Sequence, residues 1–215
     1  DRRFAWGLLA AIPFIGLLFQ LAGSYFVERT NRRKPAFFIG YLTSRLTWVA
    51  IAATPLLLGL NPTAAIACVL ALFMLHHSAS AFAVPSWTSW MSDTIPPATR
   101  GRFFGMRAQI GPFVVVPLGL LAAWLIAGAQ AGRLSYPRPQ SLFSWSMASI
   151  PFGVSTLKLC SIFFVIAAVL GAIEILLFAS VPDQPRPRTS PAPGLYQLLI
   201  EPLRNPNFRR FLLFY

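Results

Sequence analysis

Ionisable side chains inside apolar runs are the residues of this chain best placed to do chemistry. Arg45 lies nine residues into one run and Glu174 lies seven residues from the end of another, depths of about 14 Å and about 10 Å along a helix. Charges inside a membrane are costly and are normally paired. We therefore expect an intramembrane ion pair between them, more structural than substrate-binding, with snorkelling of Arg45 as the alternative.

Two adjacent histidines, His76 and His77, lie in the middle of another apolar run. Histidine can hold or pass a proton near neutral pH. Neighbouring residues point about 100° apart on a helix, so at most one of the two faces a cavity squarely. Ser80 follows His76 by four residues and shares its face. We expect a site for a proton or substrate, or equally a neutral histidine bonded to a neighbouring helix.

Arg107 and Gln109 lie early in a fourth apolar run, within reach of the mouth of a cavity. Arg107 has a second interpretation, as a loop cation that marks the start of the helix. Further along, Gly111-Pro112 and Pro117 interrupt the backbone hydrogen-bond ladder and allow that helix to bend.

Motifs of known enzyme classes are absent from the sequence. It has no GxSxG, no HExxH and no phosphate loop, and only 6 acidic residues. The paired histidines have no nearby carboxylate, which makes a poor metal site. We therefore expect no enzyme activity, no metal and no cofactor.

The elements that carry these residues belong to a membrane protein. Apolar residues make up 56% of the chain and charged residues 11%, against roughly 25% charged in soluble domains. This composition excludes an ordinary soluble enzyme and a disordered chain. The net charge is +12, but the basic residues form short clusters between apolar runs. We therefore expect the lipid bilayer as a partner, and no nucleic acid.

Five apolar runs reach the roughly 20 residues that a transmembrane helix needs: 4–26, 36–60, 63–91, 103–129 and 155–181. A sixth begins near Phe208. Alternate loops carry 12 Lys or Arg on one side and 5 on the other, so the positive-inside rule makes the first, third and fifth loops cytoplasmic. We expect an all-α polytopic helix bundle, multi-pass in the cell (inner) membrane.

The loop between the first two runs resembles the signature loop that follows the second helix of major facilitator superfamily transporters. That pattern is a small residue, three residues, an acid, a base, any residue, Gly, any residue and two bases. Three positions match and three carry mild substitutions: Arg29, Arg33 and Lys34 match, while Ser24, Glu28 and Asn31 replace Gly, Asp and Gly. Asn tolerates the left-handed turn that Gly supplies, and Ser is small enough for close helix approach.

A second loop resembles the family's loop between helices four and five, through Asp93, Arg100, Gly101 and Arg102. The resemblance implies helices two to seven of a twelve-helix fold, with the first helix missing. Residues 1–181 would be a partial N-terminal half. Residues 182–206, whose first 13 positions carry five prolines, would be the cytoplasmic central linker. Residues 207–215 would start the first helix of the C-terminal half.

The resemblance also implies a function, namely secondary active transport of a small solute by alternating access. The two loops would gate the cytoplasmic side, with Glu28 beside Arg29 and Arg33 forming charge-assisted bonds or capping a neighbouring helix. The complete protein would be a monomer, its substrate and any proton coupling left open. Arg107 replaces a glycine of the drug–proton antiporters, which disfavours drug antiport. The alternative function is a non-transporting membrane scaffold or subunit whose basic loops only orient it.

Overall fold

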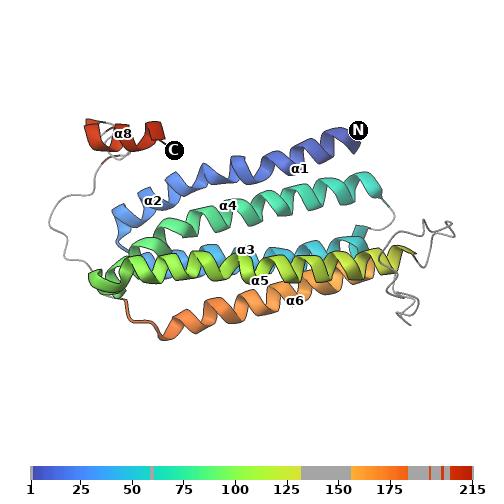
Figure 1. Cartoon of the computed structure of the whole chain (residues 1–215). Coiled ribbons are helices and arrows are strands. Elements are labelled where there is room, and N and C mark those ends of the chain that lie inside the picture. The colour runs from blue at the N-terminus through green and yellow to red at the C-terminus, as the bar shows by residue number, and fades with distance from the viewer. Residues whose placement is uncertain are drawn as a thin grey trace.

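The computed structural model describes residues 2–58, 61–131, 156–183, 194, 200 and 204–214, and this part of the chain is 93% helical without a strand. Its helices are α1 (Arg2–Leu17), α2 (Phe19–Thr30), α3 (Arg33–Leu58), α4 (Pro62–Thr94), α5 (Pro97–Ala131), α6 (Thr156–Leu177), the short 3-10 helix η1 (Phe178–Ser180) and α8 (Pro206–Phe214). Helices α1 to α6 run side by side as a bundle (Figure 1).

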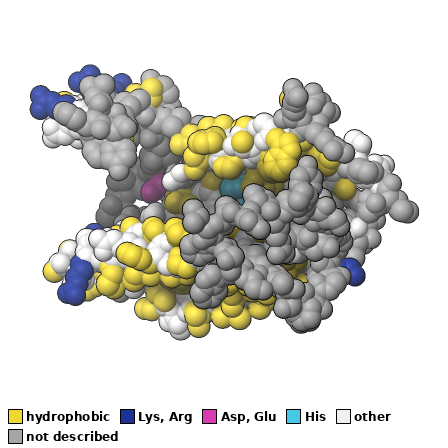
Figure 2. Space-filling view, turned by 45° about the vertical axis from the view of Figure 1, so that its right-hand side comes forward, with side chains coloured by type: hydrophobic (Ala, Val, Ile, Leu, Met, Phe, Trp, Pro, Cys, Tyr) yellow, Lys and Arg dark blue, Asp and Glu magenta, His cyan; other side chains and the backbone are white. Residues whose placement is uncertain are grey.

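Five helical segments are long and apolar enough to cross a membrane: Phe4–Thr30, Arg33–Pro55, Thr63–Thr94, Pro97–Gly128 and Thr156–Ser180. They overlap the five runs expected from the sequence. The all-α fold is therefore confirmed within the described residues, and the five apolar helices are compatible with a multi-pass membrane protein. In Figure 2, hydrophobic side chains cover most of the described part of the visible face, and Lys and Arg side chains lie toward its ends. Most of the expected 182–206 linker lies outside the described residues.

The helices extend beyond their expected limits at the end of the bundle that carries the basic loops. Helix α4 continues to Thr94 instead of ending at 91, and α5 begins at Pro97 instead of 103. The expectation counted apolar residues, whereas a helix that protrudes from a bilayer keeps its backbone bonds through polar turns. Proline suits the first position of α5, where its missing N–H would have had no helical partner.

The first spanning segment is two helices, not one. Its backbone tightens at Leu18, whose N–H donates to the carbonyl of Ile15 over 3.1 Å, three residues back instead of four. Pro13, inside α1, removes one donor from the preceding turn. The interruption therefore lies where the hydrogen-bond ladder is already weakened.

Small residues allow the central helices to approach closely. Helix α3 packs against α4 and α6, and α4 also packs against α1 and α2. A Cβ added at Gly40 of α3 would lie 2.8 Å from both the Ala79 carbonyl oxygen and the Ala83 Cβ of α4. A Cβ added at Gly23 of α2 would collide with the Phe82 backbone. Such contacts hold helices together in lipid, where apolar burial supplies little driving force.

The buried core near the basic end is aromatic, made of Phe37, Trp87, Trp90, Met91 and Ile175. The Phe37 ring centroid lies 5.5 Å from that of Trp90 and 5.3 Å from that of Phe178, in edge-on arrangements that aromatic pairs favour. Helices α3, α4 and α6 thus meet directly beneath the basic loops. By contrast, the spanning segment of α5 buries none of its most apolar stretch.

Candidate functional site

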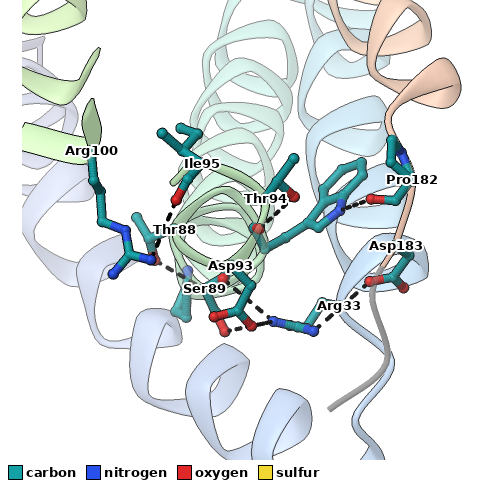
Figure 3. Close-up of polar contacts among 11 residues, drawn as sticks. Arg33, Thr88, Ser89, Asp93, Thr94, Ile95, Arg100, Pro182 and Asp183 are labelled. Carbon is teal, nitrogen blue, oxygen red and sulfur yellow. Dashed lines mark hydrogen bonds and ion pairs between the residues drawn. The ribbon is translucent and has the colours of Figure 1, made fainter. Parts of the chain in front are cut away.

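The two loops singled out in the sequence meet through a buried cation. Arg33, the first residue of α3, is 2% exposed and forms an ion pair with Asp93 near the end of α4. Its other terminal nitrogen, Nη2, lies 4.0 Å from Oδ1 of Asp183, which follows η1. The guanidinium therefore sits between two carboxylates (Figure 3). A buried charge is tolerated only when it is paired in this way.

Backbone geometry at the end of α2 brings Arg33 to this position. Asn31 adopts φ 53°, the left-handed conformation that its residue type permits, and its N–H donates to the Val27 carbonyl over 2.8 Å. The Arg32 N–H donates to Thr30 Oγ1 over 3.3 Å. Only Asn31 and Arg32 separate α2 from α3, so the reversal is tight and its direction is fixed.

Lys34 connects the same turn to the end of α6. Its Nζ donates to the carbonyl oxygens of Ala179 at 2.8 Å and Val181 at 2.9 Å. These carbonyls lie at the C-terminal end of the helical segment, where a cation also meets the negative end of the helix dipole. Trp90 supports the contact, because Nζ lies 5.5 Å from its ring centroid and its Nε1 donates to the Pro182 carbonyl over 3.0 Å.

We call this cluster the loop junction and define it as Arg33, Lys34, Trp90, Asp93 and Asp183. It joins the α2–α3 turn, the end of α4 and the first residues after η1. The sequence identified Arg33, Lys34 and Asp93 as separate loop residues but missed their convergence. It also missed Trp90 and Asp183, whose contribution depends on where α6 ends against α3.

The remaining residues of the first loop lie outside the junction. Glu28 is exposed, and the structure shows no hydrogen bond or ion pair for it among the described residues. Arg33 is paired with Asp93 instead of Glu28. Arg29 Nη1 donates to the Tyr25 hydroxyl over 2.7 Å, and Ser24 Oγ donates to the Gln20 carbonyl over 3.0 Å, both within α2.

Of the four residues named for the second loop, only Asp93 belongs to the loop junction. Arg100 Nη2 donates to the Ile95 carbonyl over 3.4 Å, a contact within the α4–α5 turn. Gly101 and Arg102 are exposed on the first turns of α5. Arg100 thus closes its own turn, while Asp93 reaches across to α3.

Arg45 and Glu174 come together as the depth comparison predicted. Nη2 of Arg45 lies 3.3 Å from Oε2 of Glu174, and the two side chains are 30% and 58% exposed. Gly171, one turn before Glu174, makes room for the arginine, because a Cβ there would lie 3.1 Å from Arg45 Cγ and closer still to its outer atoms. The pair therefore links α3 to α6 within their membrane-spanning segments.

The histidines face different neighbours. His76 is buried, and its Nδ1 lies 2.9 Å from both Oγ and the carbonyl oxygen of Ser44 on α3. His77 contacts the Phe73 ring at 4.5 Å and lies against Gly16 of α1. The structure thus shows His76 bonded to a neighbouring helix, one of the two arrangements that the sequence allowed. Ser80 is half-buried on the same helix.

A small pocket opens below the loop junction, between α3, α4, α5 and α6. Its volume is about 80 Å³, and its lining is Phe37, Tyr41, Arg45, Trp87, Arg107, Glu174, Ile175 and Phe178. The Arg107 guanidinium carbon lies 4.1 Å from the Trp87 ring centroid, a cation–π contact. Gln109 is exposed on α5 and is not part of the lining. Arg107 therefore lines the same pocket as the Arg45–Glu174 pair, and the histidines are not part of that lining.

Comparison with known proteins leaves the family open. The chain matches no family model, no curated protein and no solved structure. What the loop junction and the pocket can do therefore has to follow from their own residues.

Proposed function

We propose that the chain is part of a secondary active transporter of the major facilitator type, which carries a small solute across the cell membrane by alternating access. The observation that supports this proposal best is the loop junction. The two loops that resemble the family's signature loops are far apart in sequence, yet they share one buried ion pair between Arg33 and Asp93.

The junction would act as a rigid coupling in such a transporter. Lys34 and Trp90 hold the carbonyls of residues 179, 181 and 182, so the chain beyond η1 stays attached to α3 and α4 as far as Asp183. When this helix group rocks as a body, the residues up to Asp183 move with it. Alternating access requires bundle movement of this kind around a fixed site.

Transport assays on the full-length protein in proteoliposomes test the proposal. We would measure uptake of a labelled panel of sugars, amino acids, nucleosides and organic anions, with and without a proton gradient. We expect protein-dependent uptake of at least one class, reduced about tenfold or more by Asp93→Asn. Thr88→Ala is the matched control, because it removes a hydroxyl that bonds only within α4.

Two results would contradict the proposal. One is that folded wild-type protein transports nothing in the panel above empty liposomes. The other is that Asp93→Asn transports as fast as wild type. Either result would favour the scaffold alternative, in which basic loops serve orientation only.

A further inference from the structure

The pocket between α3, α4, α5 and α6 has an unusual composition for apolar helices, because three of its lining residues are charged. Arg45 and Arg107 contribute two positive charges and Glu174 one negative charge, so the lining carries a net charge of +1. Phe37, Trp87 and Phe178 form an aromatic wall beside them. A charged group within a spanning segment is normally retained for a partner or a function.

The donors in this pocket are only partly satisfied. Arg45 gives one terminal nitrogen to Glu174, but its Nε is buried with no hydrogen-bond partner. Among the described residues, the structure shows no hydrogen bond or ion pair for the Arg107 guanidinium, which rests on the Trp87 ring. Both arginines line the same small space, and a pair of arginines suits a phosphate or carboxylate.

The size of the pocket limits what can enter. Pockets that enclose a drug-sized ligand have volumes of about 300–1,000 Å³, so a pocket of about 80 Å³ accepts a headgroup anion and not a whole nutrient or drug. The rest of a larger ligand must lie outside. The surface around the opening therefore decides what kind of molecule the anion belongs to.

That surface is apolar. On α6, Leu170 and Leu177 lie one turn to either side of Glu174 and are 62% and 69% exposed. On α5, Ile110 lies one turn beyond Arg107 and is 51% exposed. Acyl chains would cover this surface well, whereas a water-soluble anion would leave it unmatched.

The level of the pocket along the bundle also fits a lipid headgroup. Helix α4 has 33 residues, about 50 Å at 1.5 Å per residue, so it exceeds a hydrocarbon core of about 30 Å by roughly 10 Å at each end when centred. Trp87 lies seven residues before the end of α4 at Thr94, which is about 10 Å. Tryptophan and tyrosine are enriched at this interface.

We propose that this pocket binds the phosphate of an anionic phospholipid in the leaflet on the side of the basic loops. Arg45 and Arg107 hold the phosphate oxygens, while Glu174 limits the net charge. The acyl chains lie along the exposed apolar faces of α5 and α6. Basic pockets between transmembrane helices hold lipid headgroups in this manner. The proposal does not depend on whether the protein transports a solute.

Native mass spectrometry of the full-length protein in neutral detergent tests the proposal by titration with phosphatidylglycerol and with phosphatidylcholine of the same chains. We expect phosphatidylglycerol to bind about tenfold more tightly. Arg107→Gln should weaken its binding about tenfold. Arg102→Gln removes one exposed positive charge from the same helix but not from the pocket, and should change binding less than twofold.

A second variant changes the affinity in the opposite direction, which a misfolded protein cannot mimic. Glu174→Gln raises the net charge of the pocket to +2 and should tighten phosphatidylglycerol binding about threefold. Equal losses in Arg107→Gln and Arg102→Gln, or no gain in Glu174→Gln, would overturn the assigned site. Competition by inorganic phosphate at the concentrations at which the lipid binds would overturn the lipid as occupant.

Discussion

The loop junction predicts a strict order of stability losses when the charges of its two ion pairs are removed one at a time. Arg33 is 2% exposed and pairs with both carboxylates, Asp93 and Asp183. Arg33→Gln removes the cation that pairs with both Asp93 and Asp183. Breaking a buried ion pair by removing one partner costs about 3–5 kcal/mol. We expect Arg33→Gln to lower the free energy of unfolding by about 3 kcal/mol, the low end of that range, because both carboxylates are partly solvated.

Removing either carboxylate should lower the free energy of unfolding by less than removing Arg33, and the two losses should differ. Asp93 is 23% exposed and in direct contact with Arg33, so Asp93→Asn should cost about 2 kcal/mol while Arg33 keeps Asp183. Asp183 is 31% exposed and 4.0 Å away, and Asp183→Asn should cost about 0.5–1 kcal/mol, as for a solvated ion pair. The predicted order is therefore Arg33→Gln, then Asp93→Asn, then Asp183→Asn.

A double-mutant cycle sharpens this prediction. Each carboxylate compensates for loss of the other, so the Asp93→Asn/Asp183→Asn double variant should lose more stability than the two single losses added together, by about 1 kcal/mol. Additive losses would mean that Asp183 does not share the cation with Asp93.

The assay is reversible unfolding of the full-length protein by SDS titration in neutral micelles, followed by circular dichroism. Arg32→Gln is the matched control, because it removes an exposed positive charge one residue before Arg33. We expect its loss to stay below about 0.5 kcal/mol. If Asp183→Asn cost as much as Asp93→Asn, or if Arg32→Gln cost as much as Arg33→Gln, the reasoning from burial and distance would be refuted.

Three further predictions concern single contacts. Lys34→Gln should speed amide hydrogen exchange at Val181 and Asp183 several-fold, because the donor to the 179 and 181 carbonyls is shortened and uncharged. Unchanged exchange would contradict the coupling role. Gly40→Ala should lower the free energy of unfolding by about 1–3 kcal/mol, because the added methyl group would clash with α4. Gly105→Ala is the control: its added methyl group meets open space, so it should be neutral or stabilising in the same SDS titration. His76→Leu should lower the free energy of unfolding by about 1 kcal/mol, because the hydrogen bond to Ser44 is lost. His76→Gln keeps a polar group at this position and should lose less. Equal losses in the two variants would mean that His76 contributes by packing alone.

The spans and their composition could be predicted from the sequence, because lipid demands long apolar helices wherever the chain crosses it. The Arg45–Glu174 pair could also be predicted, since depth in a spanning helix is a matter of counting residues from its end. The left-handed turn at Asn31 followed from residue type. Each of these features is determined by local chemistry or by position along a single helix.

The loop junction could not be predicted, because Arg33 and Asp93 are 60 residues apart and meet only through the register of α3 against α4. That register depends on close contacts such as Gly40 against Ala79 and Ala83, which no periodicity in the sequence reveals. The role of Trp90 was hidden for the same reason, since its partner Pro182 lies beyond the end of another helix.

One face of α3 connects the loop junction to the pocket. Arg33, Phe37, Tyr41 and Arg45 recur every four residues, so they form one stripe along the helix. Arg33 belongs to the loop junction, the other three line the pocket, and Phe37 also packs on Trp90 and Phe178. A shift of α6 against α3 would therefore disturb Phe178, Glu174 and Asp183 together. Occupancy of the pocket and closure of the loop junction thus depend on the same helix contact, and a ligand that favours one arrangement of α6 must bias both.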